Sequence, residues 1–229
     1  THANMMGLDF LLLAMDIMYL RKECKKWYDC ILYAVFIIFL DKTANSRTAE
    51  AIIAMLIVIH LLSIIMQRNW FHKMMVLFTS GAFLLCVGIP FIGSYLYIHK
   101  PELFLQHDGT MLSRIQLTTT FYLRNGGFGF YGFPIEDQDC LDMMFSYIGL
   151  HWGTAAFIII SAAIIYAIYK ASREQHTSFL ILLFFFLVYG WAEVAPIYPV
   201  YSYLSLLLGY YIMNRKPFYC KRPYTCANF

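Results

Sequence analysis

Residues 74–98 form a stretch of 25 consecutive positions without a single charged side chain. A helix needs about 20 mostly apolar residues to cross the hydrocarbon core of a bilayer, so this stretch predicts a spanning helix. Four further segments fit the same description: 3–20, 49–66, 143–169 and 177–192. Two shorter segments, 27–40 and 197–213, complete a prediction of seven spanning helices. We therefore expect an all-α, multi-pass transmembrane helical bundle that forms one domain over residues 1–229.

The composition supports a membrane protein and excludes several other classes. Of the 229 residues 60% are hydrophobic and only 14% are charged, whereas soluble domains are roughly 45–50% apolar and about 25% charged. This excludes a disordered chain and a compact cytosolic enzyme. The net charge of +3 comes without a basic tract or zinc-finger spacing, so we expect no nucleic-acid partner. The chain begins at Thr1 without Met or a charged leader, and we expect its N-terminal part to be missing.

The positive charges predict the orientation in the membrane. Of the 17 Lys and Arg residues, 12 lie in the first, third and fifth loops and the tail, and five lie in the alternate segments. Because cytoplasmic loops are enriched in Lys and Arg, we place the richer set in the cytoplasm. The start of the chain, the 41–48 loop, the long 99–142 loop and the turn at Glu193 then share the outer side.

The cysteines predict neither disulfides nor a metal site. Cys140 is expected on the outer side and Cys86 within a helix, and the cytoplasmic positions are Cys24, Cys30, Cys220 and Cys226. A single outer cysteine cannot form an intramolecular disulfide framework. Cys220 and Cys226 have no histidines at zinc-ligand spacing, so we expect no metal and no other cofactor.

The 99–142 loop is the longest outer segment, at 44 residues, and loops of this length are usually functional or disordered. It contains the glycine- and aromatic-rich run NGGFGFYG at 125–132. Glycines permit a close backbone approach to a ligand, and aromatic rings suit either the apolar faces of sugars or a membrane interface. The alternative is a re-entrant or interfacial loop that only caps the bundle.

Three outer arginines, Arg47, Arg114 and Arg124, are candidates for binding a diphosphate. The guanidinium fork matches phosphate oxygens and makes bidentate hydrogen bonds with them. The alternative is that these side chains extend to lipid headgroups, as interfacial arginines commonly do.

Four other polar residues are candidates for catalysis or substrate binding. Glu193 ends an otherwise uncharged helix, and ionisable groups at membrane depth are functional candidates by default. Asp142 opens the fifth predicted helix, where an N-cap is an equally good explanation. His2 and Asn4 stand together at the outer end of the first predicted helix, where a polar pair is ordinarily a cap.

Five short motifs, in order along the chain, resemble those of bacterial polysaccharide polymerases of the Wzy type. Residues 2–7 (HANMMG) resemble that family's His-Pro-Asn-x-x-Gly, and 45–48 (NSRT) resemble its Asp-Ser-Arg-Thr turn. Residues 112–115 (LSRI), followed by a loop ending in YG at 131–132, are similar to its Leu-Ser-Gly-Arg-Leu element. Residues 141–142 (LD) resemble the start of its Leu-Asp-Asn-x-Tyr motif, and residues 189–193 (YGWAE) resemble its Tyr-Gly-Leu-Thr-Glu motif. The chain departs from these motifs at Ala3, at Met143 and in lacking a glycine between Ser113 and Arg114.

The resemblance implies a partial membrane fold of the C-type glycosyltransferases, in the superfamily of O-antigen polymerases and ligases. It implies an enzyme of the bacterial inner membrane that joins repeat units linked to undecaprenyl diphosphate on the outer face, without a metal. A flippase and a chain-length regulator are the protein partners that it implies. The implied roles are diphosphate or sugar binding for Arg47, Arg114, Arg124 and Asn4, and catalysis for Glu193, His2 and Asp142.

Two alternatives remain open at this point. An O-antigen ligase of the same superfamily would use nearly the same arginine chemistry. A non-enzymatic polysaccharide transporter or flippase would be expected to contain an internal repeat and broken helices, and the sequence shows no repeat.

Overall fold

The computed structural model describes residues 9, 12–15, 17, 27–43, 47–104, 110–135, 141, 143–192, 209 and 211–212. Within these residues the regular elements are all helical, which confirms the all-α part of the predicted fold class. They are, in chain order, α2 (Asp29–Thr43), α3 (Arg47–Ile65), α4 (Arg68–His99), the 3-10 turn η1 (Pro101–Leu103), α5 (Thr110–Arg124), α6 (Met144–Tyr147), the π-helical turn η2 (Ile148–Trp152), α7 (Thr154–Arg173) and α8 (Thr177–Ala192).

Among the described residues, three helices are long and apolar enough to cross a membrane, namely α3, α4 and α7. The apolar helix α8 is shorter, and α2 has 15 residues. The predicted spans 3–20 and 197–213 fall largely outside the described residues. The structure therefore supports a membrane-type helical bundle without confirming seven spans.

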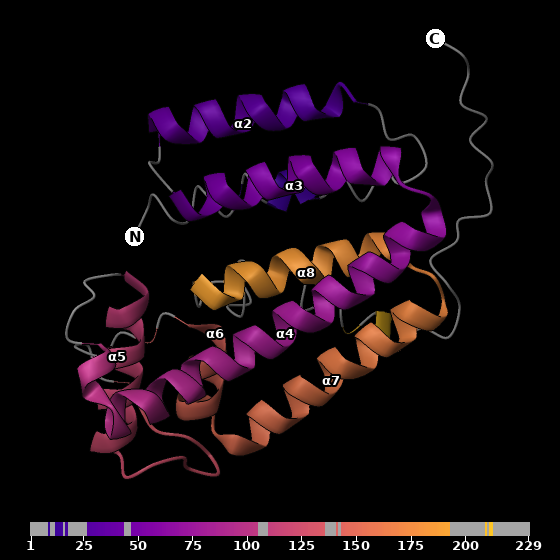
Figure 1. Cartoon of the computed structure of the whole chain (residues 1–229). Coiled ribbons are helices and arrows are strands. Elements are labelled where there is room, and N and C mark those ends of the chain that lie inside the picture. Colours follow the sequence, from indigo (N-terminus) through magenta and orange to yellow (C-terminus); the bar gives the residue numbers. More distant parts are fainter. Residues whose placement is uncertain are drawn as a thin grey trace.

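The helices are arranged around the long helix α4 (Figure 1). α4 runs diagonally with α8 along one side and α7 along the other, and α3 and α2 lie beyond α8. At the rise of an α-helix its 32 residues are about 48 Å long, well beyond the roughly 30 Å of a hydrocarbon core. The start of α3 and the ends of α4 and α8 point toward the end of the bundle that carries α5 and α6 (Figure 1).

The predicted single helix over 143–169 is wrong, because the chain breaks at Gly153. This glycine has φ of +92°, a left-handed conformation that separates η2 from α7. The first two backbone N–H groups of α7 donate to the loop at residues 129–130. Thr154 N donates to Gly129 O at 3.0 Å and Ala155 N to Phe130 O at 3.3 Å. Continuous hydropathy across 143–169 does not reveal such a break.

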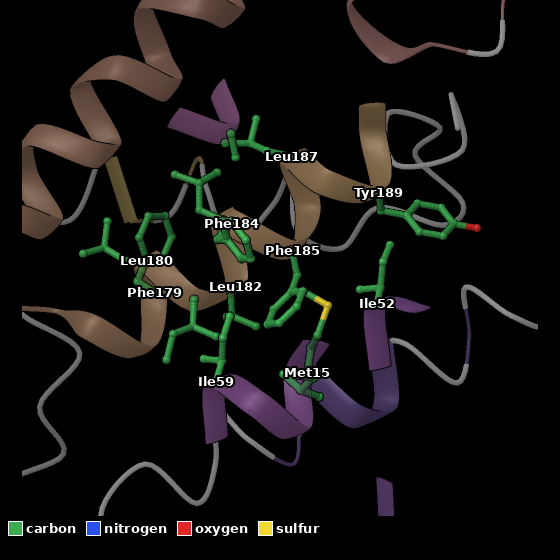
Figure 2. Close-up of a cluster of buried hydrophobic side chains, with 14 of the residues drawn as sticks. Met15, Ile52, Ile59, Phe179, Leu180, Leu182, Phe184, Phe185, Leu187 and Tyr189 are labelled. Carbon is green, nitrogen blue, oxygen red and sulfur yellow. The ribbon is translucent and has the colours of Figure 1, made fainter. Parts of the chain in front are cut away.

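The hydrophobic core is centred on α8, which is buried on nearly all sides. A helix that is apolar all round is expected to be buried by its neighbours, and its core residues are Phe179, Leu180, Ile181, Leu182, Leu183, Phe184, Phe185, Leu187 and Tyr189. Figure 2 shows Ile52 and Ile59 of α3, together with Met15, lying against this cluster. Because Ile52, near the start of α3, lies beside Tyr189, near the end of α8 (Figure 2), these two helix ends are neighbours in the core.

Buried polar groups connect α4 to α8. The hydroxyl of Thr79 shares its one proton between the carbonyl oxygen of Met75 in its own helix, at 2.7 Å, and that of Leu180, at 3.1 Å. Cys86 Sγ donates to Leu187 O at 2.8 Å. Nearer the start of α4, the Nδ1 atom of His72 lies 2.9 Å from the hydroxyl of Thr177. These contacts fix the register of the two helices, because each hydrogen bond reaches a particular turn of α8.

Candidate functional site

The described arginines of the candidate site lie on two helices near one end of the bundle. Arg47 is exposed in the first turn of α3, and Arg114 and Arg124 belong to α5. Arg114 is half-buried and Arg124 is exposed. Figure 1 shows α5 at the end of the bundle toward which the start of α3 points.

Helix α5 is held in place by one tight packing contact and one pair of hydroxyls. At Gly93 of α4, a Cβ atom would lie 2.9 Å from the side chain of Ile115, so the glycine lets α5 approach closely. Thr118 Oγ1 donates to Ser146 Oγ of α6 at 3.3 Å, and both side chains are buried. Because Arg114 is next to Ile115, the backbone that carries it is fixed relative to both α4 and α6.

Arg124 is in a different environment from Arg114. Its guanidinium lies over the ring of Phe121, 5.2 Å from the ring centroid. Ten residues separate it from Arg114, which corresponds to about 15 Å along the helix axis. The two arginines of α5 are therefore well separated from each other, and Arg47 occupies a third position, in the first turn of α3.

The last turn of α8 meets the start of α6. A Cβ atom at Gly190 would lie 2.8 Å from the sulfur of Met144, so α8 and α6 pack closely here. Met144 is two residues after Asp142, and Gly190 is three residues before Glu193. Together with the Thr118–Ser146 contact, this packing brings α5, α6 and the last turn of α8 into one group.

Four predicted site residues, namely His2, Asn4, Asp142 and Glu193, lie outside the described residues. Their predicted roles stay predictions. The described neighbours of Asp142 are Leu141 and Met143, which are both buried, and the described neighbour of Glu193 is Ala192.

The glycine- and aromatic-rich loop packs against the chain itself. A Cβ atom at Gly132 would overlap the carbonyl oxygen of His151, and one at Gly153 would overlap the backbone of Phe130. Phe133 N donates to Leu150 O at 2.9 Å across the same contact. The close backbone approach that the glycines permit is thus, at Gly132, an approach to η2 and the start of α7.

One end of this loop is anchored by aromatic rings. Phe128 packs edge-on against Tyr122 of α5 and Phe91 of α4, with ring centroids 5.1 and 5.3 Å apart. Phe91 in turn contacts Phe157 of α7 at 5.4 Å. The loop is therefore a rigid bridge between α5, α4 and α7.

Sequence reasoning missed a buried ionisable pair at the other end of the bundle. His60 Nε2 of α3 lies 3.8 Å from Asp29 Oδ2 of α2, and the two side chains are 0% and 3% exposed. A detectable signal was present, since His60 is the one ionisable residue in the apolar run 51–65, where such groups are costly.

The described residues contain no group of three or more His, Cys, Asp or Glu side chains that could hold a metal ion. Cys30 and Cys86 are free thiols. The chain matches no protein-family model, no curated protein and no solved structure.

Proposed function

We propose that the protein is a membrane glycosyltransferase that polymerises undecaprenyl-diphosphate-linked oligosaccharide repeat units into a capsular, exopolysaccharide or O-antigen chain. The proposed location is the bacterial inner membrane, with the reaction on the extracytoplasmic face. The type of reaction in this proposal comes from the resemblance of the five motifs to those of Wzy-type polymerases. The observation that carries the proposal is the group of α5, α6 and the last turn of α8, with Arg114 at a fixed position within it.

The chemistry needs positive charge at this position. Breaking a sugar–diphosphate bond releases negative charge onto the leaving group, and arginines held in place beforehand stabilise that charge without reorganisation. Arg114 is half-buried, which strengthens its electrostatic interactions relative to those of a fully hydrated side chain. Arg47, at the start of α3, is the second proposed donor to the diphosphate.

The attacking sugar hydroxyl must lose its proton as the new bond forms. A carboxylate or an imidazole within hydrogen-bond reach is the usual acceptor. We propose Glu193 or His2 for this role, with Asp142 as a further catalytic candidate and Asn4 as a contact to the sugar.

Arginine substitutions in the full-length protein test the diphosphate site. Arg114→Ala and Arg47→Ala are expected to lower the rate of polymerisation about 10²–10³-fold, the usual loss when one charge-stabilising donor is removed. Lys is expected to restore little, because a point charge does not reproduce the bidentate fork. The measurement is polymer length on gels, with the amount of protein in the membrane determined in parallel.

Arg173→Ala is the matched control. Arg173 is exposed in the last turn of α7, where its guanidinium donates to the hydroxyl of Tyr169 at 3.1 Å. This end of α7 is far along the helix from η2 and α5, so polymer length is expected to be unchanged. Long polymer in both the Arg47→Ala and the Arg114→Ala proteins would refute the proposed site.

Glu193→Gln separates a functional from a structural carboxylate, because it removes the charge and keeps the shape. If Glu193 accepts the proton, polymerisation falls about 10²–10⁴-fold at a normal protein level. If it is a buried charge partner, the protein level itself falls, since losing such a partner typically costs about 3–5 kcal/mol. Normal protein with normal chain length would remove Glu193 from the site.

A further inference from the structure

We propose that the exposed rings of Phe130, Tyr131 and Trp152, here called the aromatic crest, lie in the headgroup region of the bilayer and anchor this end of the bundle to the membrane. The proposal concerns the occupant of this surface and does not depend on the proposed reaction. Phe130, Tyr131 and Trp152 are 64%, 86% and 37% exposed, although they lie in a tightly packed part of the chain.

The depth of the crest is set by hydrogen bonds to α7. Thr154 N and Ala155 N, in the first turn of α7, donate to the carbonyl oxygens of Gly129 and Phe130 at 3.0 and 3.3 Å. α7 has 20 residues and a length of about 30 Å, which equals the thickness of the hydrocarbon core. If α7 spans the bilayer, its first turn lies at the boundary between hydrocarbon and headgroups, and so does the crest.

The crest also continues a surface of α7 that faces outward. Ile158 and Ile159, which follow within the next turn, are 59% and 68% exposed, and exposed isoleucines on a spanning helix face lipid. Trp and Tyr are enriched where such a lipid-facing surface meets water, because an apolar ring and a polar tip suit both sides of the boundary. The occupant that fits the composition and the position of the crest is therefore a phospholipid interface.

The crest is held rigidly, as an anchor requires. Gly132 packs against the carbonyl of His151, and the Nδ1 atom of His151 lies 2.8 Å from Phe133 O. The rings of Phe130 and Tyr131 pack edge-on with centroids 4.8 Å apart. In such a contact the edge of one ring lies against the face of the other, which leaves less flat aromatic surface for stacking on a sugar.

Fluorescence of an added tryptophan tests the position of the crest. The Tyr131→Trp protein is placed in nanodiscs of phosphatidylcholine and in nanodiscs of the same lipid brominated near the carbonyl end of its acyl chains. The added emission, obtained by subtracting the wild-type spectrum, is expected to fall in the brominated lipid, because the ring would lie at headgroup level, where Trp and Tyr are enriched. Because Tyr131 is 86% exposed, the substitution is expected to leave thermal unfolding unchanged.

Glu102→Trp is the matched control. Glu102 is exposed in η1, which follows the end of α4, and its charge favours water. Its added emission is expected to be quenched by iodide from the aqueous phase and to be almost unaffected by bromine. The proposal is overturned if the Tyr131→Trp protein behaves in this way, which would favour a water-facing, sugar-binding loop. It is also overturned if neither quencher reduces the added emission of the Tyr131→Trp protein, which would mean that other parts of the protein cover the crest.

Discussion

The imidazole of His60 in α3 and the carboxylate of Asp29 in α2 lie 3.8 Å apart, between Nε2 and Oδ2, and both side chains are removed from solvent. The ring of Tyr33 packs edge-on against the imidazole, with centroids 5.7 Å apart, and is itself fully buried. The other side chains along the contact between α2 and α3 are mostly apolar. The pair therefore fixes how α2 is aligned along α3, in a way that interchangeable apolar contacts cannot.

We expect Asp29 and His60 to be energetically coupled. In a double-mutant cycle of Asp29→Asn and His60→Gln, the two effects on the free energy of unfolding should differ from additivity by about 1 kcal/mol or more. The measurement is a titration with denaturing detergent. His99→Gln is the control, since His99 is exposed and should show no coupling with Asp29→Asn. Additive effects at Asp29 and His60 would show that the pair does not align the helices.

The hydroxyl of Thr79 is expected to stabilise the contact between α4 and α8. Thr79→Val keeps the shape and removes a hydroxyl that is shared between Met75 O of its own helix and Leu180 O of α8. The share that reaches α8 should contribute up to about 0.6 kcal/mol to the free energy of unfolding, the average for hydrogen bonds between membrane helices. Thr119→Val is the control, because Thr119 donates to Ile115 O of its own helix at 2.7 Å. An equal loss in both proteins would mean that the bond between helices contributes nothing extra.

Hydropathy predicted the helices that depend on apolar length alone. The segments 49–66 and 177–192 correspond to α3 and α8 within about two residues at each end, because their boundaries coincide with changes in polarity. The segment 74–98 falls within α4, which begins six residues earlier at Arg68. Charged side chains at a helix end are compatible with a helix that extends beyond the hydrocarbon core, so the apolar run underestimates its length.

Contacts between distant segments could not be predicted in this way. The break at Gly153 depends on the loop at Gly129–Gly132 that supplies acceptors for the first amides of α7. Likewise, counting charges predicted Arg114 on the outer side, but the placement of its helix depends on contacts of neighbouring residues, Ile115 with Gly93 of α4 and Thr118 with Ser146 of α6. His60 was visible as an ionisable residue in an apolar run, whereas its partner Asp29 is 31 positions earlier.

Thiol labelling tests the orientation predicted from the 12 to 5 division of positive charges. In intact spheroplasts, a membrane-impermeant reagent is expected to label Cys140 and to leave Cys24, Cys30, Cys220 and Cys226 unlabelled. Single-cysteine proteins distinguish the positions. Labelling of Cys220 or Cys226 in intact spheroplasts would reverse the orientation and place the arginine end of the bundle in the cytoplasm.

The contact between Gly132 and His151 should be a sensitive point of the loop over residues 125–132. Gly126 and Gly132 have nearly the same backbone angle, with φ of +71° and +77°, but a Cβ atom at Gly126 would meet nothing within 4 Å. Gly126→Ala should therefore cost only about 1–2 kcal/mol, the usual penalty of a left-handed conformation for alanine. Gly132→Ala adds an overlap with the His151 carbonyl and should cost a further 1–3 kcal/mol or so, as overpacking does.

The two alanine variants can be compared by detergent-induced unfolding and by limited proteolysis. Because the Gly132 contact holds the loop on the first turn of α7, Gly132→Ala should also make the peptide bonds near Phe130 and Tyr131 accessible to a protease, whereas Gly126→Ala should not. Equal stability and equal protection in both proteins would show that the loop is not fastened to α7 through Gly132. The shared backbone angle makes the comparison specific, since only the space in front of the Cβ atom differs between the two sites.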